Sequence, residues 1–310
     1  MKRQEIDKKR KKTWIKVTSI VFGLLFLSAG VFAYSVWQSI SNTAETMHNP
    51  IERETEKRTE SLTLEKQEPF SVLLLGVDER ENDSGRSDTM ITVTVNPETK
   101  SVKMLSIPRD TLTEIIGYGT EDKINHAYAF GGPEMSMNTV ENLLDIPIDY
   151  YVKINMDGFA DLVDAVGGVK VDNTFSFTYE GMHFPLGEIE LSGEDALKYT
   201  RMRYEDPNGD FGRQQRQRQV LEGIVREGLS LTSITNFQTI FDALGKNLET
   251  NMTLSELMDI QKNYGNALNS IDQLAVESSG TMINNTYYGI INEEEMLRIQ
   301  AELQEHLEVS

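Results

Sequence analysis

The chain has 310 residues and no cysteine, which excludes a disulfide framework, a thiol nucleophile and a Cys-ligated metal site. Its four histidines are scattered and form no HExxH motif, so the sequence does not predict a histidine-based zinc site. Thirty Lys and Arg against 49 Asp and Glu give a formal net charge of −19, and so acidic a chain argues against nucleic acid as a partner.

Positive charge gathers at the N-terminus, where residues 1–16 hold eight Lys or Arg and only two acidic residues. The core of the uncharged stretch that follows, VTSIVFGLLFLSAGVFAYSVW at 17–37, has about the ~20 residues that span a bilayer as a helix. Because the basic cluster lies entirely on its N-terminal side, we predict a cytoplasmic tail at 1–16 and a single-pass transmembrane signal anchor at 17–37 in the cell membrane. The alternative is a cleaved signal peptide, since Val31-Phe32-Ala33 resembles a cleavage site.

Beyond the anchor, the composition divides the chain into two parts. Residues 38–68 are rich in charge, poor in apolar side chains and free of glycine, which predicts an extracellular stalk that is partly helical or disordered. From Pro69 onward, apolar runs alternate with turn signals, so 69–310 is predicted to be one folded extracellular domain.

The outer domain shows both strand and helix patterns. Strands are expected at 70–78, 89–96, 101–107, 149–155 and 169–171, with a hairpin within 174–191. Helices are expected at 134–144, 157–167, from Ser192 onward, and at 211–228, 236–247, 253–268 and 293–308. This order predicts an α/β domain with a mixed central β-sheet flanked by helices on both faces, preceded by one N-terminal transmembrane helix.

Five of the fourteen arginines lie in residues 199–219, YTRMRYEDPNGDFGRQQRQRQ, where Asp210 is a suitable N-cap for the following helix. At 100° per residue, one face of that helix carries Arg213, Arg216, Gln217, Val220 and Ile224. Its apolar half points inward, and inward-facing arginines near a helix N-terminus predict a bound anion or, alternatively, internal carboxylates. Arg218 lies off this face and is expected at the surface, whereas Arg201 and Arg203 share a face if the chain is extended there.

Two aspartates lie at the ends of the first two predicted strands. Asp78 ends one and Asp88 begins the next, so their carboxylates meet at one sheet edge if the strands are neighbours. Two carboxylates with free coordination positions suit Mg²⁺, and Arg86 and Arg109 lie beside the same edge. A metal ion together with several arginines is suited to a diphosphate. Turn and capping roles are the alternative for the two aspartates.

Seven blocks in fixed order then resemble the LytR–CpsA–Psr family, most closely its wall teichoic acid transferases. The blocks are LLLGVD, GRSDTMI, SIPRDT, KINHAYAFGG, YYVKINMDGFADLVDAVGGV, ALKYTRMRY and DFGRQQRQ. They cover about 70–228, so the resemblance implies a family core at 70–228 within an extracellular catalytic domain at 69–310.

The resemblance implies an enzyme that transfers an anionic glycopolymer phosphate from a polyprenyl-diphosphate carrier to a peptidoglycan sugar hydroxyl with the help of Mg²⁺. Asp78 and Asp88 match the metal-associated aspartates, and we favour Asp88 over Asp78 as the base for the acceptor hydroxyl. The positions that match the diphosphate-binding arginines are Arg86, Arg109, Arg201, Arg203, Arg213 and Arg216. Lys123 and Gln217 match further polar contacts.

Three other functions remain open at this point. A lipid-diphosphate hydrolase would use water at the same site, a membrane-bound transcriptional attenuator would act on DNA, and a glycopolymer-binding module would have no catalysis. An extracellular location and an acidic body argue against the attenuator. The lipid tail also needs an apolar groove, for which the face of 157–167 and the Val220/Ile224 pair are candidates, with ordinary core packing as the alternative.

The charge asymmetry around 17–37 makes a topology prediction. A reporter fused after Ser310 is expected to be active only outside the cytoplasm, and the full chain is expected to remain in the membrane fraction. Protein sequencing of the purified chain is the check, because a mature N-terminus at Tyr34 would contradict the uncleaved anchor.

Overall fold

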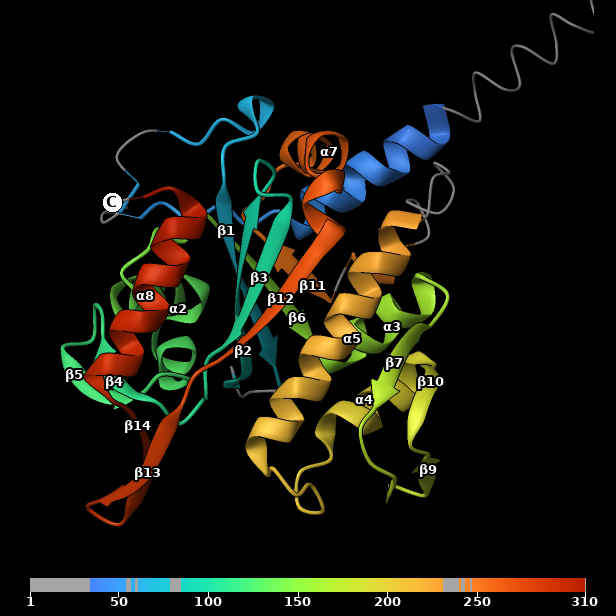
Figure 1. The fold of residues 1–310 in the computed structure, drawn as a ribbon. Helices are drawn as coiled ribbons and strands as arrows, with labels where there is room; N and C mark the ends of the chain where they lie inside the picture. Colours follow the sequence, from blue (N-terminus) through green and yellow to red (C-terminus); the bar gives the residue numbers. More distant parts are fainter. Residues whose placement is uncertain are drawn as a thin grey trace, which may run out of the picture.

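The computed structural model describes residues 34–53, 57–58, 61–78, 85–230, 240, 243–245 and 247–309. A six-stranded sheet runs through the centre of the domain (Figure 1). Its strands, in spatial order, are β11 (Leu248–Thr250), β6 (Tyr150–Asn155), β1 (Phe70–Val77), β2 (Ser87–Asn96), β3 (Ser101–Ser106) and β12 (Ser270–Ala275). The β1–β6 and β3–β12 pairs are parallel and the other three are antiparallel, so the predicted mixed sheet is confirmed.

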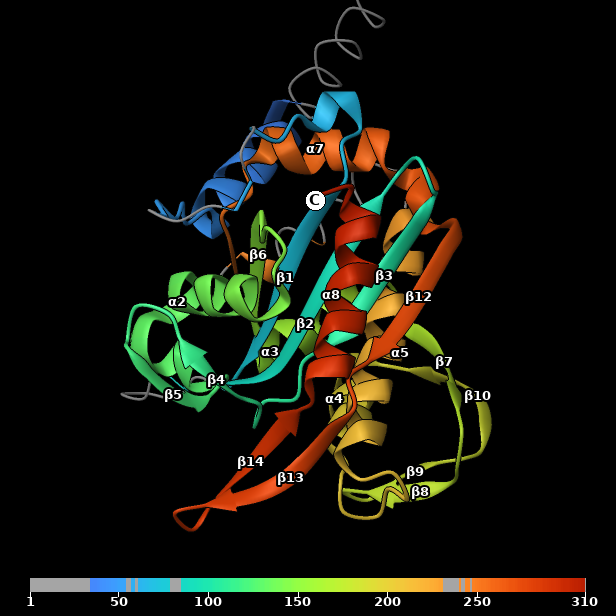
Figure 2. The same cartoon turned by 60° about the vertical axis from the view of Figure 1, so that its left-hand side comes forward.

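Helices cover both faces of this sheet, as predicted (Figures 1 and 2). One face carries α2 (His126–Leu144) and α8 (Glu293–Leu307), whose buried side chains pack with Leu73, Leu75 and Leu105. The opposite face carries α3 (Met156–Ala165), α4 (Gly193–Arg201) and α5 (Asp210–Ser230). The helix α7 (Leu254–Asn263) lies across one end of the sheet (Figure 2).

Four small antiparallel pairs surround the central sheet. They are β4 (Leu112–Ile115) with β5 (Thr120–Lys123), β7 (Val169–Asn173) with β10 (Gly187–Leu191), β8 (Phe177–Tyr179) with β9 (Met182–Phe184), and β13 (Ser278–Ile283) with β14 (Thr286–Ile291). Short 3₁₀ turns are η1 (Leu64–Lys66) and η2 (Gly265–Asn269). The β13–β14 hairpin projects from the body of the domain (Figure 2).

The strands predicted at 70–78, 89–96, 101–107 and 149–155 are confirmed, and the Ser192 hydroxyl caps α4 by accepting from the Asp195 amide. The helices predicted at 211–228, 253–268 and 293–308 are confirmed in position, but the strands β12, β13 and β14 at 270–291 were not predicted. Polar and apolar residues mix in SIDQLA of β12, an edge strand with no fully buried residue, so no strand signal stands out. The helix predicted at 236–247 falls largely outside the described residues.

The predicted stalk at 38–68 does not stand away from the domain. Residues 34–47 are helical, with four side chains of one stripe buried: Val36, Ile40, Ala44 and Met47. Arg53 donates to Glu141 at 2.9 Å and Arg58 donates to Asp149 at 2.9 Å. Charges that look solvated in the sequence are therefore paired with acidic groups of the domain, which docks this segment.

Residues 17–33 of the predicted anchor lie outside the described residues. Among the residues that the structure does describe, no helix combines the length and hydropathy required to cross a bilayer.

The end of α8 is secured to the sheet by a buried histidine. The two ring nitrogens of His306 form hydrogen bonds with the hydroxyl groups of Thr94 at 2.7 Å and Ser101 at 2.9 Å. Burial, together with the charge of Lys103, lowers the pKa of His306 to about 4, although the nearby carboxylates of Asp272, Glu302 and Glu308 oppose the shift. The neutral imidazole is therefore the form that the folded protein keeps.

This histidine predicts a pH-dependent stability. The unfolded chain takes up a proton on His306 near pH 6.5, whereas the folded chain resists it until about pH 4. Stability is fully present above pH 6.5 and falls as the pH drops towards 4, by a contribution of about 3 kcal/mol. Denaturant unfolding across this range should show a weaker pH dependence for His306→Gln than for the wild-type chain. Equal slopes would contradict the assignment.

Candidate active site

A cavity of about 530 Å³ lies between the central sheet and the helices α3, α4 and α5. Most of its wall is apolar, including Leu74, Ile91, Val152, Phe159, Leu162 and Ile224. Its charged lining residues are Asp78, Asp88, Glu180, Arg201 and Arg213. The cavity is thus an apolar slot with charged groups of both signs, a form suited to an amphipathic ligand.

The helix faces that were candidates for a lipid groove divide between cavity wall and core. Phe159 and Leu162 of α3 and Ile224 of α5 line the cavity, whereas Val163 and Val220 are fully buried in the core. Ordinary core packing therefore holds for Val163 and Val220, and the lipid-groove role of the lining residues stays a prediction.

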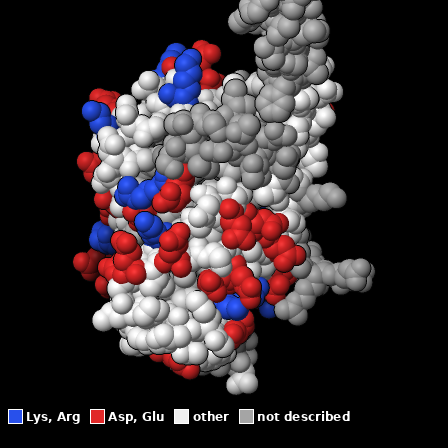
Figure 3. Space-filling view, turned by 90° about the vertical axis from the view of Figure 1, so that its right-hand side faces the viewer, with Lys and Arg blue, Asp and Glu red and all other residues white. Residues whose placement is uncertain are grey.

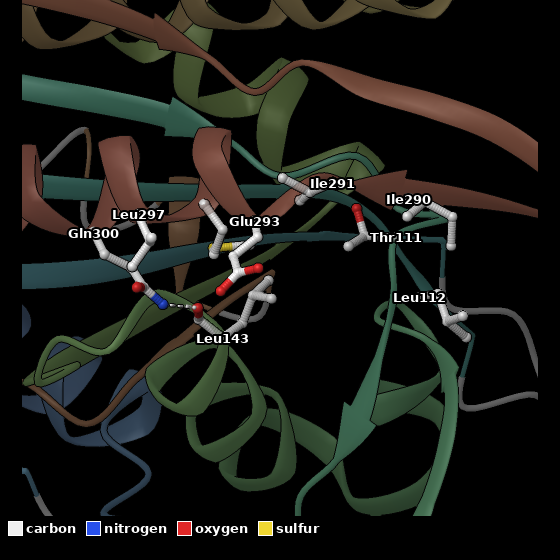
Figure 4. A pocket seen from close by; sticks show the side chains of 9 residues that line it. Thr111, Leu112, Leu143, Ile290, Ile291, Glu293, Leu297 and Gln300 are labelled. Carbon is white, nitrogen blue, oxygen red and sulfur yellow. Dashed lines mark hydrogen bonds between the residues drawn. The ribbon is translucent and has the colours of Figure 1, made fainter.

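A second cavity, of about 350 Å³, lies on the other side of the sheet between α8, α2 and the base of β14 (Figure 4). Thr111, Leu143, Ile290 and Gln300 are among its lining residues, and Glu293 is the one charged residue of the lining. Without a cationic side chain in its lining, this cavity is not suited to a diphosphate.

The two aspartates meet at one edge of the sheet, as predicted, because β1 and β2 are antiparallel neighbours. The register shifts there: Gly76 pairs with Thr89 and Val77 pairs with Ser87, so Asp88 is the extra residue of a β-bulge. A bulge redirects the side chain of its extra residue, and this one gives Asp88 a place in the cavity wall. Asp78 follows β1 directly and lines the same cavity.

Asp88 accepts a hydrogen bond of 2.7 Å from Nη1 of Arg109. Burial works against the charge of Arg109, but the carboxylates of Asp88 and Asp110 raise its pKa above the ordinary value. Lys123 donates to Asp110 at 2.5 Å and is not among the residues that line the cavity. The structure therefore does not bring Lys123 together with the other predicted diphosphate-binding residues. Arg86 is exposed just before β2, next to the bulge.

Asp210 holds two of the predicted arginines at the start of α5. It accepts from Nε of Arg213 at 2.9 Å, and Nε of Arg203 lies 3.5 Å from the same oxygen. Burial disfavours the Asp210 charge, yet Arg213, Gln214 and Arg203 lower its pKa below the ordinary value. Asp210 is the first helical residue of α5, and it orients arginine side chains at the cavity.

Gln217 completes this side of the cavity. Its amide nitrogen donates to the Thr89 hydroxyl at 2.9 Å, which links α5 to the start of β2. Arg201, the last residue of α4, also lines the cavity while remaining exposed. The structure therefore brings Arg201, Arg213 and Gln217 together with the two aspartates.

Arg216 is placed differently from the prediction. It is buried and is not part of the cavity wall in the described chain. Its Nε donates to the Tyr199 carbonyl at 2.8 Å, and its two Nη groups bond the Asp206 carboxylate and the Met202 carbonyl. Three aromatic rings surround the guanidinium, the nearest centroid at 5.4 Å. The alternative of an internal carboxylate holds here, and Arg216 joins the 199–206 segment to α5.

No sequence pattern singled out Asp206, which sits in the turn-like stretch EDPNGD. Its carboxylate is almost completely buried beside Gly212. A Cβ at position 212 would lie 2.0 Å from an Asp206 oxygen, so only glycine leaves room for this carboxylate next to α5. The glycine of the DFG tripeptide at 210–212 is thus a packing requirement of the Arg216 pair.

The prediction that Arg218 lies at the surface is wrong. Its exposed fraction is 6%, and it donates to the Ser106 hydroxyl at 2.7 Å and to the Gln273 side chain at 3.3 Å. Burial lowers the pKa of Arg218 to about 10, so the side chain is still charged at neutral pH. The side of α5 that carries Arg218 packs against β3 and β12, and the sequence pattern does not predict β12.

The arginines of the cluster differ in burial: Arg213 and Arg216 are buried, whereas Arg86 and Arg201 are exposed on an acidic molecule. Asp and Glu side chains predominate over much of the face shown in Figure 3. Within the described ranges, no group of three or more His, Asp or Glu side chains could hold a metal ion, and the magnesium site at Asp78 and Asp88 stays a prediction.

Comparison with known proteins assigns the family. The model of the LytR–CpsA–Psr (LytR_cpsA_psr) family matches residues 34–305. The chain belongs to the LytR–CpsA–Psr family. It is 49% identical over 301 residues to the polyisoprenyl-teichoic acid–peptidoglycan teichoic acid transferase TagU of Bacillus subtilis, with 97% of this chain and 98% of TagU covered. The TagU of Halalkalibacterium halodurans is 50% identical over 304 residues, which cover 96% of this chain and 100% of that protein.

Solved structures of the family share the fold. The crystal structure of B. subtilis TagU is 49% identical, superposes with a TM-score of 0.65, and covers 78% of this chain and 98% of its own. A structure of TagT bound to LIIa-WTA is 34% identical with a TM-score of 0.73 and covers 84% of this chain and 100% of that chain. An Enterococcus faecalis structure described as a transcriptional regulator is 44% identical and superposes with a TM-score of 0.74. The match covers 81% of this chain and 92% of that chain.

The buried pair makes a stability prediction. Arg216→Ala leaves the Asp206 carboxylate buried without its cation, which is expected to lower the free energy of unfolding by about 3–5 kcal/mol. Exposed Arg226 of the same helix is the control, and Arg226→Ala is expected to stay within about 0.5 kcal/mol of wild type. Denaturant unfolding measures both variants. An Arg216→Ala variant as stable as Arg226→Ala would contradict the assigned role.

Proposed function

We propose that the chain transfers an anionic glycopolymer, wall teichoic acid, from a polyprenyl-diphosphate carrier to a sugar hydroxyl of peptidoglycan. The observation that carries the proposal is one cavity whose wall is mostly apolar and whose polar lining includes Arg201, Arg213 and Gln217 together with Asp78 and Asp88. Such a cavity complements a ligand whose one end is a hydrocarbon chain and whose other end is a diphosphate. The names of the TagU relatives, at about half identity over nearly the whole chain, support the same substrates.

Each part of the ligand has a counterpart in the cavity. Arg201, Arg213 and Gln217 bind the diphosphate oxygens, and Phe159 and Ile224 contact the start of the polyprenyl chain. Arg203 and Arg86 add positive charge at the same end, whereas Arg216 acts by holding the 199–206 segment in place. The forked guanidinium group suits phosphate oxygens, and the apolar wall beside the arginines strengthens the attraction.

The transfer forms one bond and breaks one. The acceptor hydroxyl oxygen bonds to the phosphorus that carries the polymer, and the bond from that phosphorus to the bridging oxygen breaks, which releases polyprenyl phosphate. Asp88 takes the hydroxyl proton, and Arg109, bonded to Asp88 at 2.7 Å, holds the carboxylate in position. The arginines stabilise the negative charge that accumulates on the phosphate oxygens and the leaving group.

The residues at this edge fit a magnesium ion. Asp78 and Asp88 offer hard oxygen ligands beside a diphosphate site, which is the setting in which proteins hold Mg²⁺ with one or two carboxylates. When bound, the ion offsets the charge of the diphosphate oxygens.

We also propose that the chain is anchored in the cell membrane by 17–37, with its catalytic domain outside the cell. That placement would bring both the membrane-bound donor and the wall acceptor within reach.

The alternative function as a transcriptional attenuator gains no support, since the arginines line a cavity or hold its surroundings in place in an acidic protein. The hydrolase alternative is separated by product analysis: transfer requires peptidoglycan, whereas hydrolysis releases free polymer phosphate in its absence.

Arg213 provides the direct test of the diphosphate site. Arg213→Ala is expected to reduce transfer roughly ten- to a hundredfold, because a charge-assisted phosphate contact contributes about 1.5–3 kcal/mol. The exposed Arg226→Ala on the same helix should keep wild-type activity. Transfer from a purified polyprenyl-diphosphate donor to peptidoglycan measures both, and equal activities would exclude Arg213 from the site.

The two aspartates are expected to respond differently to neutralisation. Asp88→Asn should retain the lipid donor but lose transfer at every magnesium concentration, because an amide cannot accept the proton. Asp78→Asn should weaken metal binding and recover part of its transfer activity as magnesium is raised. Donor retention and transfer are measured together across the titration. Recovery of Asp88→Asn by magnesium would exclude Asp88 as the base and leave it as a metal ligand.

A further inference from the structure

The geometry of phosphoryl transfer defines where the acceptor must approach, given the proposed function on which this inference rests. In an in-line displacement, the attacking oxygen and the leaving oxygen lie on opposite sides of the phosphorus. The leaving lipid occupies the cavity on the side of α3, α4 and α5. The acceptor therefore comes from another side of Asp88 than the lipid. Arg109, which is bonded to Asp88, precedes β4 in the chain, and the β4–β5 pair and the β13–β14 hairpin lie at the same end of the domain (Figure 2).

A continuous series of polar contacts leads outward from Asp88 on that side. Arg109 lies 3.8 Å from Asp110, which accepts from Lys123 at 2.5 Å. The Lys123 ammonium is 5.8 Å from the centre of the Tyr288 ring in β14. The backbone of the hairpin is also joined to this segment, since an amide of β14 donates to the Asp110 carbonyl at 2.8 Å.

The series continues to the start of α2. The Tyr288 hydroxyl donates to Asp122 at 3.3 Å, and Asp122 forms a 2.7 Å hydrogen bond with His126. His126 in turn contacts the ring of Phe130, with 5.7 Å between ring centroids. These contacts make one surface that extends from the catalytic edge to an aromatic residue.

At its outer end, this surface carries two large exposed aromatic rings. Tyr118 is 54% exposed and Phe130 is 40% exposed, and their rings stack with centroids 4.1 Å apart and planes inclined by 16°. Tyr118 is presented by a tight turn in which Gly117 and Gly119 have φ of +89° and +78°, values that side chains disfavour. Exposed stacked aromatics mark an interaction site, and they offer flat apolar faces to the C–H faces of sugar rings.

The neighbouring hairpin differs from these polar contacts in carrying no charge. Residues 278–292 contain no charged side chain, although the chain as a whole carries −19. Met282 and Tyr287 of the hairpin are 61% and 50% exposed. The outer part of the surface therefore offers uncharged and aromatic side chains, which suit sugar rings, while the charged pairs of Asp110, Lys123 and Asp122 lie closer to Asp88.

We propose that the surface formed by Tyr118, His126, Phe130 and Tyr288, here named the acceptor surface, binds the glycan strand of peptidoglycan. The stacked pair of Tyr118 and Phe130 holds a sugar ring of the strand, and Tyr288 and Lys123 lie between that ring and Asp88. A bound strand is thereby positioned with a hydroxyl directed to the phosphorus from the side opposite the lipid.

Binding and transfer measurements on the full chain in detergent test this proposal. Tyr118→Ala and Phe130→Ala are each expected to weaken binding to purified, polymer-free glycan strands about five- to tenfold, and to raise the acceptor concentration needed for half-maximal transfer similarly. Retention of the polyprenyl-diphosphate donor should be unchanged in both. Met258→Ala is the control, because Met258 is a 45% exposed apolar side chain of α7 at another part of the domain.

Each outcome separates the acceptor surface from the function on which it rests. Wild-type glycan binding that survives both substitutions would overturn the acceptor surface alone. Failure of the wild-type chain to bind glycan strands would overturn the acceptor surface and the proposed peptidoglycan acceptor together. Loss of binding to phospholipid vesicles in place of glycan strands would assign the aromatic pair to the membrane and overturn the proposal.

Discussion

The buried contact between Arg216 and the 199–206 segment is the interaction on which the site depends. One guanidinium bonds the Asp206 carboxylate and the carbonyls of Tyr199 and Met202, and it lies among three aromatic rings. The 199–206 segment, which Arg216 holds in place, carries Arg201 and Arg203. The helix α5, to which Arg216 belongs, also carries Arg213. A single buried cation thus places three others around the cavity, while its own charge is neutralised by Asp206.

This arrangement explains how a protein with a net charge of −19 can present positive charge to an anion. Asp210, Asp206 and Asp88 hold the arginines in defined orientations, and the carboxylates reduce their mutual repulsion. Arg201 and Arg213 nonetheless line the cavity beside Asp78, Asp88 and Glu180, and their guanidinium groups are suited to phosphate oxygens. An acidic exterior is therefore compatible with an anion site, because the cations that bind the anion are local to the cavity.

The sheet and the inward direction of α5 could be predicted from sequence, since strands β1, β2, β3 and β6 follow clear apolar patterns. The separate roles of neighbouring arginines could not. A helical projection describes one buried face, but α5 contacts α4 on one side and the β3–β12 edge on another. Arg216 and Arg218 are consequently buried against partners that are distant in the sequence or, as with Asp206, look like turn residues. The bulge that directs Asp88 into the cavity likewise depends on strand register, which the residue pattern does not reveal.

The proposed function requires that the cavity between the sheet and α3, α4 and α5 holds a polyprenyl diphosphate. Native mass spectrometry of the full chain, extracted from membranes in mild detergent, can detect such a ligand. We expect a protein species with one bound polyprenyl diphosphate, with or without attached sugar, that persists after detergent removal in the gas phase. Recovery of the bare protein alone, or of the protein with only ordinary phospholipid in that place, would contradict it.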